Sequence, residues 1–226
     1  MSNPYQSPAT NSTLLKTDEP VEQLNPLISV WLHPRRTIRY VLKVHPEKFV
    51  ILFAVLSGIH TNLNRAISKG SADSEAFVSI IIAAVIGGAI FGILSLYVFA
   101  WLQSISGKWL GGSGTSDELR TASAWSSIPA IVGLIIALSH IVFVGKDLFS
   151  QSVEPFMENE ILNLAYWGSV VVETLLSVFA FIIYIVFVSE VHKFSIGRSI
   201  FCTLLSFLLF FVPIFALIFG IGFISA

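Results

Sequence analysis

The stretch from Gly107 to Pro129, GKWLGGSGTSDELRTASAWSSIP, lies between two runs of nearly pure hydrocarbon side chains. Glycine allows backbone conformations that other residues resist, and four glycines open the stretch: Gly107, Gly111, Gly112 and Gly114. Thr115 and Glu118 then have the spacing of a capping box, which starts a helix. The stretch therefore predicts a turn between two membrane spans. Pro129 is expected to kink the helix as it enters the second span.

The composition of the whole chain agrees with membrane spans. Of its 226 residues, 54% are hydrophobic and 12% are charged, whereas soluble domains contain about 25% charged residues. The single cysteine, Cys202, excludes an intramolecular disulfide and lies in an apolar run, where we expect a small core residue. The histidines have no metal-ligand spacing, so no metal or other cofactor is expected.

Five apolar runs are long enough to cross a bilayer, which takes about 20 helical residues. We expect an all-α polytopic membrane protein with spans at about 49–67, 76–102, 122–144, 161–189 and 199–224. In the second run, Gly88 and Gly92 have the GxxxG spacing that lets a neighbouring helix approach closely. Pro213 is expected to interrupt the fifth span.

The chain is expected to hold one membrane domain, residues 25–226, after a disordered polar tail, residues 1–24. Within this domain, segment 27–45 has apolar residues at helical spacing and cations on the other face. This pattern favours helices in the headgroup layer, with interfacial residues Trp31, Arg35, Arg36, Arg39 and Lys43. The alternative is an amphipathic helix that packs on a partner or on the protein itself.

The distribution of cations predicts the orientation, because cytoplasmic segments are enriched in Lys and Arg. If the N-terminus is cytoplasmic, the inner segments hold nine cations, namely Arg35, Arg36, Arg39, Lys43, Lys48, Lys108, Arg120, Lys193 and Arg198. The outer segments then hold only Arg65, Lys69 and Lys146. We therefore expect a cytoplasmic N-terminus and a C-terminus outside.

This orientation places six polar residues in the outer half of the bilayer: His60, Asn62, Asn64, Arg65, His140 and Glu173. Glu173 is the most informative of them, because a carboxylate in the membrane must be paired or protonated. Its partners by depth are His60, Arg65 and His140. One hypothesis is a proton or ion site at which Glu173 titrates, and the other is a structural clasp between the first, third and fourth spans.

Several soluble-site motifs are excluded. Lys108 is followed by Trp109, where a phosphate-binding P-loop requires Ser or Thr. Ser113 lies in a GxSG sequence like that of intramembrane serine proteases, with His140 downstream as a conceivable base. His140 is expected near the opposite membrane face, too far from Ser113 to share a proton. The cations follow the membrane borders, so no nucleic-acid partner is expected.

Two of these features together resemble the Yip1 domain family of membrane proteins: the Trp-x-x-Pro-Arg-Arg-Thr-Ile sequence from Trp31 to Ile38, and the glycine-rich turn GKWLGGSGTSDELRTASAWSSIP. The resemblance runs from about Asn25 onward. It implies a five-helix bundle with a cytoplasmic N-terminus. Eukaryotic members associate with prenylated small GTPases, but this chain lacks their Asp-Leu-Tyr-Gly-Pro motif, so the resemblance does not imply GTPase binding here. The chain is more similar to the prokaryotic members.

These observations predict a non-enzymatic protein of the cell membrane, or of the inner membrane in a Gram-negative bacterium. It would contact the lipid bilayer and bind a membrane-protein partner or a second copy, or organise the bilayer. The alternative function is a small permease or proton-coupled carrier that uses Glu173.

Overall fold

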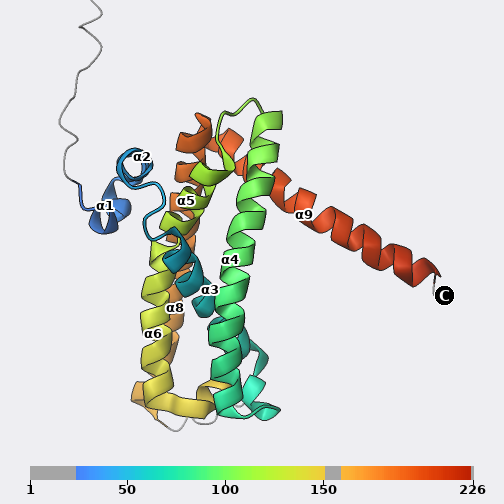
Figure 1. Cartoon of the computed structure of the whole chain (residues 1–226). Coiled ribbons are helices and arrows are strands. Elements are labelled where there is room, and N and C mark those ends of the chain that lie inside the picture. The colour runs from blue at the N-terminus through green and yellow to red at the C-terminus, as the bar shows by residue number, and fades with distance from the viewer. Residues whose placement is uncertain (1–23, 151–158, 225–226) are drawn as a thin grey trace, which may run out of the picture.

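The computed structural model describes residues 24–150 and 159–224, with side chains to Phe215. The disordered tail was predicted for residues 1–24. Residues 1–23 lie outside the described residues, so the prediction is not tested there. In order, the elements are α1 (Pro26–Leu32), α2 (Pro34–Val44), α3 (Val50–Lys69), η1 (Ser71–Asp73), α4 (Phe77–Trp109), α5 (Ser116–Ser126), α6 (Ile128–Val144), η2 (Gly145–Phe149), α8 (Glu160–His192) and α9 (Ile196–Ile224). Within the described residues the fold is all-α, as predicted (Figure 1).

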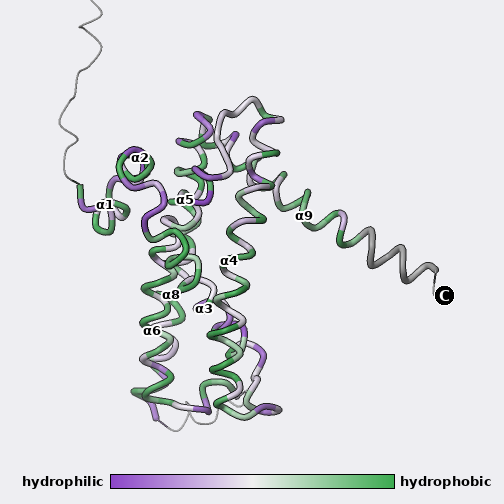
Figure 2. Tube along the Cα trace, viewed as in Figure 1, coloured by the Kyte–Doolittle hydropathy of each residue, from purple (hydrophilic) through white to green (hydrophobic). Residues whose placement is uncertain are grey.

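Five of these helical stretches have the length and composition to cross a membrane, which confirms the number of predicted spans. They are α3, α4, the run from α5 through η2, α8 and α9. Large apolar side chains face outward along them, among them Ile86 (57% exposed), Val142 (79%) and Leu164 (76%), and hydrophobic stretches dominate α4, α6 and α8 (Figure 2). A contiguous exposed apolar surface of this kind is not stable in water, so the protein is a multi-pass membrane protein.

Helices α3 and α4 approach each other through glycines. A Cβ atom built on Gly58 would lie 2.1 Å from the carbonyl oxygen of Gly88, and one on Gly92 would lie 2.2 Å from that of Ala54. The GxxxG face of α4 therefore packs directly on the backbone of α3. The sequence reasoning missed Gly58, although Ala54 and Gly58 have the same small-residue spacing as Gly88 and Gly92.

Two prolines differ from their predicted roles. Helix α5 ends at Ser126 and α6 begins at Ile128, so Pro129 lies in the first turn of a new helix instead of kinking a continuous one. A proline is favoured there because the N–H that it lacks would have no helical partner. Helix α9 continues through Pro213 and is not interrupted.

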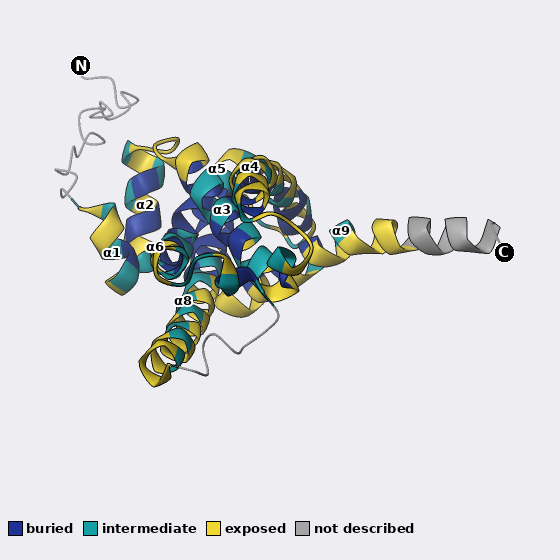
Figure 3. Ribbon diagram, turned by 90° about the horizontal axis from the view of Figure 1, so that it is seen from below, coloured by how far each residue is buried: buried dark blue, intermediate teal, exposed yellow. Residues whose placement is uncertain are grey.

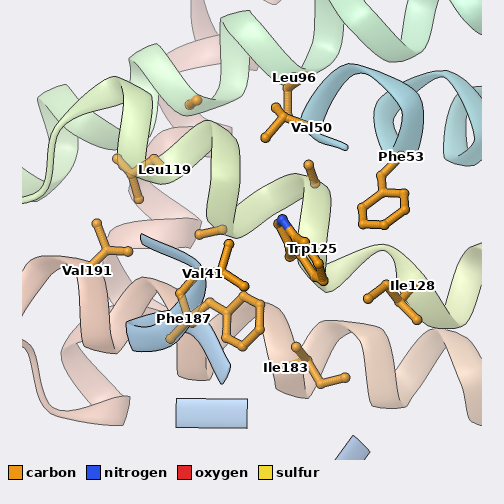
Figure 4. Packing of buried hydrophobic residues seen from close by; sticks show 14 of the residues in the cluster. Val41, Val50, Phe53, Leu96, Leu119, Trp125, Ile128, Ile183, Phe187 and Val191 are labelled. Atoms are coloured by element: carbon orange, nitrogen blue, oxygen red, sulfur yellow. The ribbon is translucent and has the colours of Figure 1, made fainter. Parts of the chain in front are cut away.

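The helices form a bundle of α3, α4, the α5–α6 pair and α8, from which α9 leaves obliquely (Figures 1 and 3). We call the end with residues 107–115 and the α8–α9 link the turn end, and the end with η1 and η2 the opposite end. Near the turn end, the largest buried cluster packs side chains of α2, α3, α5 and α8 around Trp125 (Figure 4). Thr115 and Glu118 form the predicted capping box at the start of α5.

Candidate functional site

Three of the six predicted polar residues meet where α3 faces α6 and α8. The Asn64 amide nitrogen lies 3.1 Å from His60 Nε2 and donates a hydrogen bond to Glu173 Oε2 at 3.3 Å. His60 Nε2 is 3.9 Å from the same carboxylate oxygen. His60 also packs against Gly133 of α6, where a Cβ atom would lie 2.7 Å from Nε2. The Asn64 amide therefore joins α3 to α8, and the His60 ring packs α3 against α6.

A cavity of about 440 Å³ adjoins this group. Its walls include Asn64, His140, Glu173, Thr174 and Ser177. His140 reaches the cavity from α6, with its ring 6.0 Å from that of Tyr166. Glu173 is thus both a member of a side-chain contact and part of a polar cavity wall, so both hypotheses for this residue retain support.

Asn62 and Arg65 lie apart from this group. They line a second cavity, of about 250 Å³, with Lys69, Glu75 and residues of α4. Arg65 is therefore not placed as the partner of Glu173. The prediction grouped the six residues by their depth in the membrane alone. Successive residues of a helix point about 100° apart, so residues at the same depth can face different helices.

At the turn end, the glycine turn, residues 107–115, encloses a histidine that the sequence reasoning did not identify. A Cβ atom on Gly107 would lie 2.1 Å from His192, and those on Gly112 and Gly114 would lie within 2.8 Å of its ring. The Gly114 N–H donates a hydrogen bond to His192 Nδ1 at 3.1 Å, so Nδ1 carries no hydrogen and the ring proton is on Nε2. Gly111 has a different reason to be glycine, a φ of +82° with open space around it.

Segment 27–45 is attached to the same end of α8. Arg39 donates a hydrogen bond from Nε to Glu190 Oε1 at 2.7 Å, and its Nη2 is also 2.7 Å from that oxygen. Ile38 and Val41 are fully buried, and the Trp31 ring stacks on Phe179 of α8 at 5.5 Å. The apolar face of α2 thus packs on the protein itself, the alternative left open above. Arg35, Arg36 and Lys43 are exposed, and the position of the segment in the headgroup layer stays a prediction.

A buried polar contact at this end holds the start of α9. Gln103 of α4 donates to Thr203 Oγ1 at 3.0 Å and accepts from the Tyr184 hydroxyl of α8. Ser106 and Ser206 share a hydrogen bond of 2.7 Å beside Cys202, which is fully buried as expected. These polar residues lie in apolar runs, and their pairing across three helices has no signal in the sequence.

The serine–histidine pair considered above is not brought together, and the described residues hold no metal-binding group. Ser113 lies in the glycine turn before α5, whereas His140 lies near the far end of α6. No group of three or more His, Cys, Asp or Glu side chains in the described part of the chain is placed to hold a metal ion.

Comparison with known proteins adds one match. No curated protein and no solved structure gives a significant match to the chain. The family model of the Yip1 domain matches residues 28–218. This range takes in α2, the glycine turn, the Glu173 group and most of α9. The chain therefore belongs to the Yip1 domain family.

Proposed function

We propose that this protein is a non-enzymatic scaffold of the cell membrane that binds a partner protein in the cytoplasm at its turn end. The observation that carries the proposal is that two segments far apart in sequence are fixed to one short stretch of α8. Glu190 holds α2 through Arg39, and His192 holds the glycine turn. A surface held at both sides is preorganised for binding, which lowers the entropic cost of recognition.

The side chains that this framework presents suit a protein ligand. Arg35, Lys43 and Lys108 are exposed cations, and beside Lys108 the Trp109 ring is 65% exposed. Arginine and tryptophan are enriched in the energetically important centres of interfaces. An acidic segment of a partner therefore matches the chemistry of this surface.

A photo-crosslinking amino acid tests the proposal when it replaces Arg35 or Lys108, one residue in each segment. Val142 and Phe143, which are 79% and 78% exposed near the opposite end, serve as matched controls. In native membranes we expect both turn-end positions to capture the same protein and the control positions to capture lipid. Lipid adducts alone at Arg35 and Lys108 would contradict partner binding there.

The cavity beside Glu173 supports a second function, that of a proton-coupled carrier. A carrier needs a polar path to its coupling group, and Glu173, Thr174 and Ser177 line a space of about 440 Å³. The contacts of Glu173 with Asn64 and His60 equally suit a clasp. The variant Glu173→Gln in liposomes separates the carrier from the clasp. If the protein is a carrier, the variant should lose the proton flux that wild type supports. If Glu173 is a clasp, wild type and variant should give the same proton permeability.

A further inference from the structure

A cavity of about 320 Å³ opens where the start of α1, the end of α2 and the start of α3 meet α5. Its walls include Leu27, Tyr40, His45, Lys48, Phe49 and Trp125. It lies beside the residues that attach segment 27–45 to the bundle, but none of the contacts described above fills it. The Trp125 ring, 2% exposed, closes its inner wall.

The polar groups of this cavity favour an anion. Lys48 brings an ammonium group, Tyr40 a hydroxyl and His45 an imidazole, and none of the described residues that line the cavity carries a carboxylate. The neighbouring cavity on the other side of the α2–α3 link is lined by three carboxylates, those of Glu47, Asp117 and Glu118, together with Arg120. Lys48 makes no ion pair with a described residue, and its Nζ lies 5.2 Å from the centre of the Phe49 ring.

The position and the apolar walls favour a lipid as the source of that anion. Lys48 stands two residues before the first membrane-spanning helix, which begins at Val50. Leu27 and Phe49, 45% and 40% exposed, flank the polar groups with hydrocarbon surface. Phe49 has a φ of +64°, a conformation rare for any residue but glycine, and the centre of its ring lies 6.4 Å from that of Trp125. A cation beside apolar walls at the start of a span matches a headgroup above its acyl chains.

We propose that this cavity binds the phosphate group of a membrane phospholipid. Lys48 neutralises the phosphodiester, His45 and the Tyr40 hydroxyl donate hydrogen bonds to it, and Leu27 and Phe49 contact the first methylenes of an acyl chain. The bound lipid would fill the gap between segment 27–45 and the bundle. The stability of the proposed partner-binding surface would then depend on which phospholipids the leaflet contains.

Native mass spectrometry of the full chain with added phosphatidylglycerol tests this proposal. The variant Lys48→Ala removes the cation, Tyr40→Phe removes one hydroxyl without changing the ring, and Lys43→Ala removes an exposed cation outside the cavity. We expect Lys48→Ala to weaken binding of the tightest lipid about tenfold, the factor that the loss of one charge-assisted hydrogen bond implies. Tyr40→Phe should weaken it less, and Lys43→Ala should bind as wild type does.

Equal binding by wild type and Lys48→Ala, or equal losses in Lys48→Ala and Lys43→Ala, would overturn the proposal. Inorganic phosphate added in excess separates a lipid site from a site for free phosphate. We expect the lipid to stay bound, because its acyl chain contributes to the affinity. Displacement by phosphate alone would overturn the assignment to a lipid. A lipid-binding failure leaves the crosslinking test of partner binding unaffected, since that test uses Arg35 and Lys108.

Discussion

Replacement of Gly58 or Gly92 by alanine is expected to destabilise the protein in detergent by about 2 kcal/mol, the usual cost of overpacking a tight contact. The added methyl carbon would stand 2.1 Å or 2.2 Å from a carbonyl oxygen of the facing helix. Because that oxygen belongs to the backbone, no side-chain rotation relieves the overlap, and α3 and α4 must move apart. Unfolding by a denaturing detergent, followed by circular dichroism, measures the change.

Gly168→Ala is the matched control for this prediction. Gly168 is also in a spanning helix, α8, but nothing lies within 4 Å of its built Cβ atom. Alanine has the higher helix propensity by about 1 kcal/mol, so this variant should be neutral or slightly more stable. If all three substitutions behaved alike, the close packing of α3 on α4 would be refuted.

A second large effect is expected from Gly107→Ala. Its methyl carbon would overlap the His192 ring, which is only 2% exposed and is held by the Gly114 N–H. The ring must leave its site or the glycine turn must open, at a cost of about 2 kcal/mol. Gly197→Ala in α9 adds the same methyl group where nothing lies within 4 Å, and it should be tolerated.

A double-mutant cycle makes this second prediction specific. His192→Ala alone removes the ring and the hydrogen bond from Gly114, so it also destabilises the protein. In the His192→Ala background, however, the methyl group of Gly107→Ala has space. The double mutant should therefore lose about 1–3 kcal/mol less unfolding free energy than the sum of the losses of the two single mutants. Strict additivity would mean that Gly107 and His192 do not touch.

The membrane fold was predictable because lipid imposes a simple pattern on the chain. Spans must be apolar over their whole length, and helix starts carry local chemistry such as the Thr115–Glu118 capping box. Both signals lie in continuous stretches of the chain, so one sequence is enough to find them. Pro129 shows the limit of local rules, because proline suits both a kink and a first helical turn, and only the neighbouring geometry separates the two.

The candidate site was less predictable because its contacts join distant residues. Asn64 contacts Glu173, and Gly114 contacts His192, through the arrangement of whole helices. Depth in the membrane grouped Arg65 with Glu173, yet Arg65 lines a different cavity. His192 follows an apolar run, as a histidine at the membrane surface would. Nothing in the neighbouring sequence shows whether such a histidine is enclosed by a turn or is in contact with water.

Cysteine labelling from the two sides of the membrane tests the central claim, that five helices cross a bilayer with the glycine turn in the cytoplasm. Ser113 in the turn and Ser74 beside η1 are exposed and are separated by α4, Phe77–Trp109. The native Cys202 is fully buried and can be replaced by serine as a precaution. In intact cells, a membrane-impermeant maleimide should label Ser74→Cys at once and Ser113→Cys only after permeabilisation. Labelling of both positions from the same side would contradict the account.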